Sequence, residues 1–252
     1  MEWQGEGTVI ARRPHGETAV IIDVLTAQHG RHAGLVPGGA SRKRAAMLQP
    51  GARLALRWRA RSDDQLGHFH AEPVHLRAGL LADPLGLAGL NAVCALLLFT
   101  LPERDPHPAL VARTEALLDA MEAGRDWPRD YLRWEMGLLD EMGFGLDLAS
   151  CAVTGARDGL AYVSPRTGRA VSRKGAGEWA DRLLPLPALM GGAGDNRGDG
   201  LGEGLAITGH FLETRIAAEL AGRRLPAARA RLIRRLTARA PQTGAPQAET
   251  QP

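Results

Sequence analysis

The 252-residue sequence predicts an α+β protein, with a small β-domain in residues 1–79 and a helical domain in residues 80–240. In the first segment, apolar and polar side chains alternate between frequent Gly and Pro breaks, whereas apolar residues in the second recur at helical spacing. The charge changes at the same place. Residues 12–61 contain ten Lys or Arg against two acids, while residues 80–150 contain five against twelve. A basic β-domain followed by an acidic helical block is therefore expected.

Five short strands are expected in the β-domain, at residues 8–11, 18–25, 28–36, 53–61 and 67–76. A basic break at residues 12–16 follows the first strand, and a Pro-Gly-Gly break at residues 37–39 ends the third. Residues 40–48 are polar and basic and can hold a turn of helix. Five strands in roughly 75 residues fit a small Greek-key barrel of the oligonucleotide-binding (OB) type.

The fourth strand is the most informative, because its side chains separate by type onto two faces. Apolar residues occupy alternate positions, namely Leu54, Leu56, Trp58 and Ala60. Arginines occupy most of the positions between them, namely Arg53, Arg57, Arg59 and Arg61. Since side chains alternate across a strand, we expect one face to join the core and the other to present four guanidinium groups.

Three helices are expected in the middle of the chain, at residues 87–101, 108–123 and 128–142, with Gly143 as the final stop. Residues 150–175 contain several glycines and only short apolar runs, which predicts a hairpin or loop insertion. Residues 190–204 hold seven glycines and are expected to form a flexible loop. Helix returns over residues 205–239, and the polar residues 241–252 are expected to be disordered.

The composition is that of a soluble globular protein, with 44% apolar and 23% charged residues. Cys94 and Cys151 are too few for a disulfide framework or an all-cysteine zinc site. Residues 1–20 lack the apolar stretch of a secretory signal. The most apolar window is uninterrupted only over residues 92–101, about half of the ~20 residues that a membrane span needs. No membrane partner is expected.

Several segments, in the same order along the chain, resemble the RecO family of bacterial recombination mediators. In the β-domain these are GTVIARRPHGE, LTAQHGR and PGGASRKR. In the helical domain they are YLRWEMGLLDEMGFGLDLASC, GHFLETRI and LPAARARLI. The resemblance extends from about Trp3 to Leu236 and implies an N-terminal OB-fold, a helical domain and, in some members, a four-cysteine zinc ribbon.

The zinc ribbon is the feature in which this chain departs from the family. Zinc-bearing members place two Cys-x-x-Cys pairs where this chain has Cys151-Ala152-Val153-Thr154 and then residues 164–174 without cysteine. One thiolate cannot make a tetrahedral cysteine-rich site. We therefore expect a degenerate zinc-ribbon-like hairpin in residues 150–175, held by packing alone, and no metal or cofactor.

Nine basic residues of the β-domain are the candidates for binding DNA: Arg12, Arg13, Arg31, Arg42, Lys43, Arg44, Arg57, Arg59 and Arg61. Lys and Arg contacts to phosphate supply most of the non-specific affinity for nucleic acid. The alternative is a solvated charge run without a ligand. Aromatic residues that could stack on bases are few (Trp3, Trp58 and Phe69). The protein is therefore expected to contact the nucleic-acid backbone, with little sequence preference.

Motifs of catalysis are missing from the sequence. It contains no P-loop, no G-x-S-x-G, no HExxH and no paired-carboxylate motif. His68, His70 and His75 have no further metal ligand at convincing spacing, and solvated histidines are the better interpretation. The protein is therefore not expected to be an enzyme.

The resemblance implies two protein partners besides single- and double-stranded DNA. These are RecR and the acidic C-terminal tail of single-stranded-DNA-binding protein (SSB), which ends in an apolar residue. A receptor for such a tail needs an apolar pocket edged by a cation, and Arg133 beside Trp134 is our candidate. The alternative is a surface arginine paired with Asp130 or Glu135.

The function that follows is DNA repair and homologous recombination. The resemblance implies a mediator in the cytoplasm, at the nucleoid, that anneals complementary strands and helps RecR load recombinase onto SSB-coated DNA. Two other functions stay open from the residues alone. One is an OB-fold module that binds RNA or acts in translation, and the other is a non-catalytic adaptor whose basic face binds an acidic protein.

Overall fold

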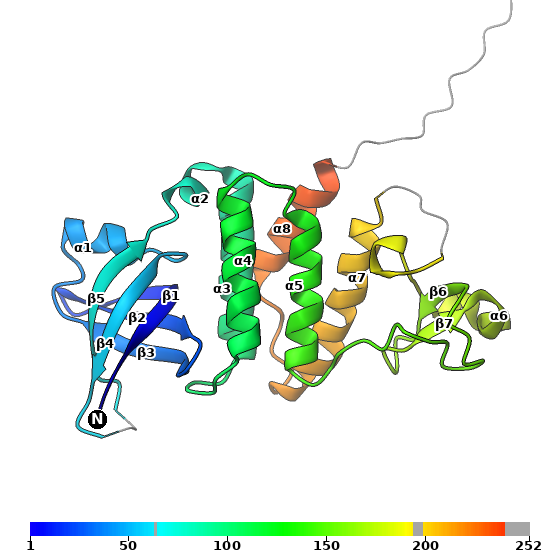
Figure 1. Cartoon of the computed structure of the whole chain (residues 1–252), viewed down its shortest axis with the longest axis horizontal. Helices are drawn as coiled ribbons and strands as arrows, with labels where there is room; N and C mark the ends of the chain where they lie inside the picture. The colour runs from blue at the N-terminus through cyan, green and yellow to red at the C-terminus, as the bar shows by residue number, and fades with distance from the viewer. Residues whose placement is uncertain (63–64, 194–198, 240–252) are drawn as a thin grey trace, which may run out of the picture. The chain divides into compact units, whose positions relative to one another are not determined.

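The computed structural model describes residues 1–62, 65–193 and 199–239 (Figure 1). It divides into two compact units that differ from the expected domain ranges. The first unit joins Met1–Gly145 to Leu212–Leu232, so it contains both the barrel and most of the helices, and the second begins with Leu146–Phe211 and takes up the chain again at Ile233. The tail expected at residues 241–252 lies outside the described residues.

The N-terminal strands form a closed barrel in the order β1-β2-β3-β5-β4. The strands are β1 (Glu2–His15), β2 (Ala19–Thr26), β3 (Gly30–Val36), β4 (Arg53–Arg59) and β5 (His68–His75). Neighbouring strands pair antiparallel except β3 and β5, which run parallel where Leu35 meets His68. A short helix, α1 (Arg42–Met47), lies between β3 and β4 in the chain. The prediction of five N-terminal strands is confirmed.

The first strand is longer than the sequence pattern predicted, and the expected break at residues 12–16 is wrong. β1 pairs with β4 through Glu2–Thr8 and with β2 from Gly7 to His15, so one strand serves two partners. A bulge between Val9 and Ala11 shifts the register, which interrupts the two-residue alternation on which the prediction depended. The chain turns only at Gly16, where φ is +59°.

The barrel core follows the alternation predicted for β4. Leu54, Leu56 and Trp58 are at most 3% exposed, and they pack with buried Val, Leu and Phe side chains of the other strands. Phe69 lies against the backbone of Gly34, where a Cβ atom would be only 2.4 Å from the ring. Glycine is therefore required at position 34, because any side chain would displace Phe69.

Three helices of the first unit begin at prolines. The helices of this unit are α2 (Ala78–Ala82), α3 (Pro84–Thr100), α4 (Pro108–Glu122) and α5 (Pro128–Glu141), followed later in the chain by a π-helical turn (Leu212–Ala217). The last helix, α8 (Ala227–Arg239), begins in the first unit, which ends at Leu232. Pro suits the first helical position, where its missing N–H is not needed. Asp83 caps α3 by accepting hydrogen bonds from the N–H groups of Leu85 and Gly86. These helices match the predicted ranges closely.

The apolar helix α3 is a core helix, as the sequence predicted. Most of its residues are buried. The helix runs beside α4 in the first unit (Figure 1). None of the described helices is both long enough and apolar enough to cross a bilayer.

The second unit is built on a small sheet in the order β7-β6-β8, from β6 (Leu160–Val163), β7 (Ala170–Ser172) and β8 (Leu184–Pro185). The hairpin expected in residues 150–175 is formed by β6 and β7. A short helix, α6 (Arg173–Ala176), follows β7, and α7 (Leu201–Phe211) completes the unit.

The loop expected at residues 190–204 needs a correction at its end. Residues 194–198 are outside the described residues, but Leu201–Phe211 are helical. The Asp199 carboxylate accepts a hydrogen bond from the N–H of Leu201 at 3.1 Å, and Leu201 and Leu205 are buried. Capping and burial outweigh the poor helix propensity of the glycines, which the sequence pattern alone could not show.

Candidate nucleic-acid interface

The outer side of β4 carries a row of arginines, Arg53, Arg57 and Arg59, which we call the β4 basic face. Arg57 and Arg59 are exposed, and their strand neighbours Leu56 and Trp58 point into the core. On the neighbouring strand β5, His70 lies opposite Arg57 and His68 opposite Arg59. β4 ends at Arg59, so Arg61 lies beyond the strand rather than in the row, and it is exposed.

Two carboxylates that the sequence reasoning missed lie on the same face. Glu2 on β1 contacts Arg59 at 2.9 Å and Arg57 at 3.8 Å, and Glu6 contacts Arg53 at 2.7 Å. Glu2 and Glu6 are separated by an even number of residues, so they share one face of the first strand. This spacing could have placed both carboxylates on one face from the sequence alone, but the first strand was expected to start only at residue 8. The β4 arginines are thus partly neutralised within the chain.

A cavity of about 680 Å³ opens beside this face. Its lining comes from the start of β1, the end of β4 and the start of β5, namely Met1, Glu2, Arg59, Ala60, Arg61, Gln65, Gly67 and His68. Two guanidinium groups therefore border a single hollow large enough for a phosphate group. The sequence reasoning did not predict this cavity, because it depends on the closure of the barrel.

The basic cluster Arg42-Lys43-Arg44 lies on α1 and is fully available to solvent. α1 buries none of its residues, and all three basic side chains are exposed. Arg44 donates a hydrogen bond to the Pro37 carbonyl at 2.7 Å, which orders its side chain on the loop before the helix. The helix thus presents three positive charges at one corner of the barrel.

The remaining predicted arginines have a different environment. Arg31 is only 17% exposed in its side chain; it pairs with Asp23 at 3.3 Å and donates a hydrogen bond to the Leu101 carbonyl at 3.0 Å. Arg13 contacts the same Asp23 at 3.3 Å. Burial raises the pKa of Asp23, and the two arginines oppose that rise. Arg31 is therefore held inside the protein, where it links β3 to the segment after α3.

The nine candidates do not converge on one spot. Gln4 on β1 lies opposite Arg57, whereas Arg12 lies eight residues further along the same strand, opposite Ile22 on β2. At about 3.3 Å per residue, that separation is roughly 26 Å along the strand. Arg57, Arg59 and Arg61 share one end of the barrel, Arg12 and Arg13 lie at the other end of β1, and Arg12 is only half exposed.

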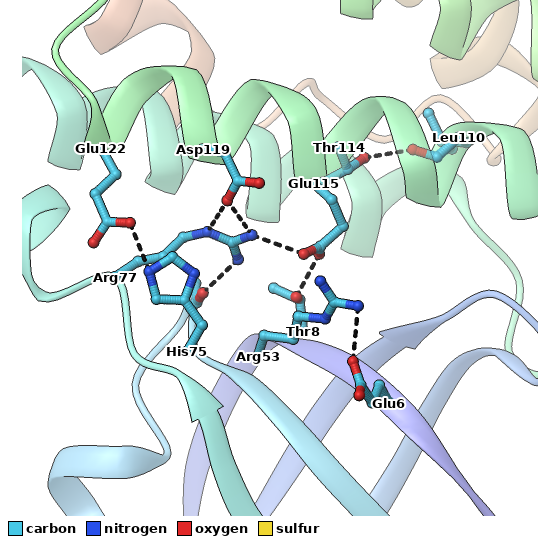
Figure 2. Close-up of polar contacts among 11 residues, drawn as sticks. Glu6, Thr8, Arg53, His75, Arg77, Leu110, Thr114, Glu115, Asp119 and Glu122 are labelled. Carbon is cyan, nitrogen blue, oxygen red and sulfur yellow. Dashed lines mark hydrogen bonds and ion pairs between the residues drawn. The ribbon is translucent and has the colours of Figure 1, made fainter.

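A buried arginine joins the barrel to α4. Arg77 is 2% exposed and has a left-handed backbone with φ of +45°. Its guanidinium donates to Glu115 at 2.7 Å, to Asp119 at 2.6 and 2.9 Å, and to the Gly51 carbonyl of the barrel at 3.0 Å. Figure 2 shows Arg77 between these two carboxylates, which α4 presents toward the strands. The left-handed conformation is unusual for a residue with a side chain, and this network holds it in place.

Two further contacts extend this joint along α4. Thr8 on β1 donates a hydrogen bond to Glu115 at 2.5 Å, and His75 at the end of β5 contacts Glu122 at 2.8 Å (Figure 2). The three acids Glu115, Asp119 and Glu122 lie on one face of α4 because they are four and three residues apart. The joint fixes the barrel against the helices of the first unit.

A second cavity, of about 480 Å³, lies between α4 and α5 and contains the predicted pair. Its lining residues are Arg113, Ala116, Leu117, Ala120, Arg125, Asp130, Arg133 and Trp134. Trp134 is buried and donates a hydrogen bond to Thr114 at 2.9 Å, so its ring forms part of a rigid floor. The pocket is apolar at its base and has three arginines at its edge, of which the sequence reasoning had identified one.

Arg133 is both a lining residue of the pocket and a surface arginine paired within its own helix. Its partner is Asp130 at 2.8 Å, one turn earlier on the exposed face of α5. Glu135 is not its partner, because that carboxylate is fully buried and binds Arg229.

Comparison with known families accounts for most of the chain. Residues 1–77 match the family described as "Recombination protein O N terminal", and residues 81–224 match the one described as "Recombination protein O C terminal".

Three relatives, each named "DNA repair protein RecO", are similar over nearly the full length. The protein of Paracoccus denitrificans is 64% identical over 238 residues, covering 94% of this chain and 97% of the relative. The protein of Cereibacter sphaeroides (strain ATCC 17029) is 59% identical over 233 residues, with 92% and 97% covered. The protein of Roseobacter denitrificans is 55% identical over 234 residues, with the same coverage.

Proposed function

The chain belongs to the RecO family of DNA repair proteins, and we propose that it is a non-catalytic recombination mediator that binds single- and double-stranded DNA through its barrel. We assign the barrel to the OB type, because five strands close it and a helix lies between the third and fourth strands. The exposed β4 basic face carries this proposal, since it places Arg57 and Arg59 where a nucleic-acid backbone can reach them.

The proposed mechanism is charge neutralisation. Two DNA strands repel each other through their phosphates, and guanidinium groups on the β4 basic face and on α1 reduce that repulsion when both strands bind. The barrel buries Trp58 and Phe69, so stacking on bases contributes little. Binding is therefore dominated by phosphate contacts, falls steeply with salt, and permits annealing of any complementary pair.

We further propose that the pocket between α4 and α5 receives the C-terminal tail of SSB. That tail is acidic and ends in an apolar residue. The pocket offers the matching chemistry, with Leu117 and Trp134 at its base and guanidinium groups at its edge. RecR is proposed as the second protein partner, so that the complex loads recombinase onto SSB-coated DNA in the cytoplasm, at the nucleoid.

Annealing of complementary single strands, measured with and without SSB, tests the proposed function. A mediator anneals bare strands and also anneals strands coated with its cognate SSB. An RNA-binding module predicts a preference for structured RNA in competition, and an adaptor for acidic proteins predicts no salt-sensitive nucleic-acid binding. Failure to anneal SSB-coated strands would contradict the mediator function.

The pocket has its own test, because the residues on α5 allow a matched control. Arg133→Ala is expected to weaken binding of a peptide with the SSB tail sequence by about tenfold, since a charge-assisted contact contributes roughly 1.5 kcal/mol. Arg129→Ala removes an exposed arginine of the same helix that does not line the pocket. Equal affinities of the two variants, measured by fluorescence anisotropy, would place the tail elsewhere.

A further inference from the structure

Two short turns of the second unit have the same form and meet at one sulfur atom. In the first, the N–H of Thr154 donates a hydrogen bond to Cys151 Sγ at 3.4 Å. In the second, the N–H of Gly175 donates to Ser172 Oγ at 3.0 Å. Each turn therefore directs the N–H of its fourth residue to the side chain of its first. Cys151 precedes β6 in the chain, and Ser172 is the last residue of β7.

Hydrogen bonds to the sulfur connect the two turns. Ser172 donates to Cys151 Sγ twice, from its N–H at 3.2 Å and from its hydroxyl at 3.3 Å. The hydroxyl oxygens of Thr154 and Ser172 are 3.5 Å apart. Burial raises the pKa of the Cys151 thiol, but the hydrogen bonds from Ser172 and Thr154 outweigh it and lower the pKa to about 6. Three donors therefore point at the Cys151 sulfur, and hydrogen bonds to an ionised acceptor are stronger than those to a neutral one.

The spacing of these four residues is that of a zinc ribbon, although the second pair ends one residue beyond the range 164–174 in which the resemblance placed it. Residues 151 and 154 form one pair separated by two residues, and residues 172 and 175 form the other, which is the spacing of two Cys-x-x-Cys pairs. The donor set does not fit zinc. Cys151 supplies one thiolate, Thr154 and Ser172 supply only neutral hydroxyls, and Gly175 supplies no side chain, whereas structural zinc needs four Cys or His ligands.

The glycine shows how the cluster has adapted. A Cβ atom at position 175 would lie 2.9 Å from Cys151 Sγ and 3.1 Å from Ser172 Oγ, closer than a carbon atom can comfortably approach. Gly175 does not have a left-handed backbone, so its conformation does not require glycine. Instead, the absence of a side chain lets the second turn close onto the sulfur, into the space that a fourth ligand would need.

We infer that hydrogen bonds centred on Cys151 replace a four-cysteine zinc site in this chain and hold the two turns together without metal. These hydrogen bonds act in addition to the packing that was expected to hold the hairpin. The backbone still directs positions 154, 172 and 175 toward the sulfur. Three cysteines at these positions would therefore complete a tetrahedral ligand set around a zinc ion. The two turns would have to move apart to admit the ion, with each sulfur about 2.3 Å from the metal.

The test is a full-length variant that combines Thr154→Cys, Ser172→Cys and Gly175→Cys. After exposure to zinc and dialysis, the triple variant is expected to retain one zinc per chain and the unaltered protein none. With Co²⁺ in place of zinc, the triple variant is expected to show the strong visible absorption of tetrahedral thiolate coordination. Adding Cys151→Ala to the triple variant abolishes that absorption. Stoichiometric zinc in the unaltered protein, or a folded triple variant without metal, would overturn the inference.

A second measurement covers the case in which the triple variant does not fold. Ser172→Ala removes the hydroxyl that donates to Cys151 and accepts from Gly175, so cleavage of the second unit by a protease at limiting concentration is expected to accelerate several-fold. Ser164→Ala is the matched control, because Ser164 accepts one N–H at the exposed turn of the same hairpin. The inference fails if the two variants are cleaved at the same rate as the unaltered protein.

Discussion

Arg229 donates two parallel hydrogen bonds to Glu135, one to each carboxylate oxygen, and both are 2.8 Å long. The two residues are 94 positions apart, and both are buried, with Glu135 at 0% and Arg229 at 7% exposure. Burial lowers the pKa of Arg229, but the carboxylate of Glu135 outweighs that effect and raises it. This fork joins the start of α8 to the middle of α5 within the first unit.

Removing one member of this pair is expected to cost far more stability than removing both. Glu135→Leu or Arg229→Leu removes the ion-pair partner of a buried charge, so each should lower the free energy of unfolding by about 3–5 kcal/mol. The double variant should be closer to the unaltered protein than either single variant. Urea denaturation checks this, with Arg231→Leu, an exposed neighbour on α8, as the control. The prediction is contradicted if the loss of unfolding free energy in the double variant equals the sum of the losses in the two single variants.

The β4 basic face and α1 are expected to set the salt dependence of DNA binding. For single strands, the slope of log affinity against log salt falls by about 0.7 for each phosphate that the protein no longer neutralises. Arg57→Ala with Arg59→Ala should therefore reduce the slope by up to about 1.4, and the combined Arg42→Ala, Lys43→Ala and Arg44→Ala by up to about 2.1. Titrations of DNA at several salt concentrations measure the slope. An unchanged slope removes the altered element from the interface.

Arg31→Ala is expected to act on stability rather than on the salt slope. Its guanidinium pairs with buried Asp23 and binds the Leu101 carbonyl, so its removal leaves two buried acceptors short of a donor. The melting temperature should fall while the slope of DNA binding stays constant. A reduced slope at unchanged stability would place Arg31 in contact with phosphate after all.

Glu2→Gln is expected to strengthen DNA binding. Its carboxylate contacts Arg59 and Arg57, and it competes with phosphate for the same guanidinium groups. The amide keeps the shape but removes the charge, so affinity should rise and the salt slope should become steeper. Glu17→Gln, on the turn between β1 and β2, makes the same charge change away from β4 and serves as the control. The prediction fails if both variants gain affinity equally.

Acid sensitivity of the barrel is expected to depend on His32. The ring is buried among Trp3, Trp58 and Phe69, and this burial, followed by the nearby charges of Arg104 and His29, lowers its pKa to about 4. The unfolded chain binds a proton near pH 6.5, whereas the folded protein does not. Stability is therefore lost as the pH falls from about 6.5 to 4, by at most ~1.4 kcal/mol per pH unit.

The measurement is the free energy of unfolding of His32→Phe and of the unaltered protein, each at about pH 7 and at about pH 4.5. These two pH values span most of the range over which the loss is expected. Phe cannot take up a proton, so the difference between the two pH values should shrink in the variant. His15→Phe, an exposed residue at the end of β1, is expected to leave that difference unchanged. A His32→Phe variant with the full acid loss would assign the sensitivity to other groups.

Sequence patterns predicted the strands and helices well because burial imposes regular spacing on them. The alternation in β4 placed Leu56 inside and Arg57 outside correctly. The same reasoning could not distinguish Arg31 from Arg57, because Arg31 is withdrawn from solvent by Asp23 and by a carbonyl 70 residues away. The cavity beside β4 was likewise unpredictable, since its lining combines the start of β1 with segments about 60 residues away.

The helix α4 has a consequence for how two ligands act together. One of its faces binds Arg77 through Glu115 and Asp119, and another lines the pocket with Ala116 and Leu117. The barrel and the pocket are therefore parts of one compact unit, joined through a shared helix rather than a flexible linker. With the proposed ligands, a tail captured in the pocket raises the effective concentration of its attached DNA at the barrel, so that two weak contacts give one tight attachment.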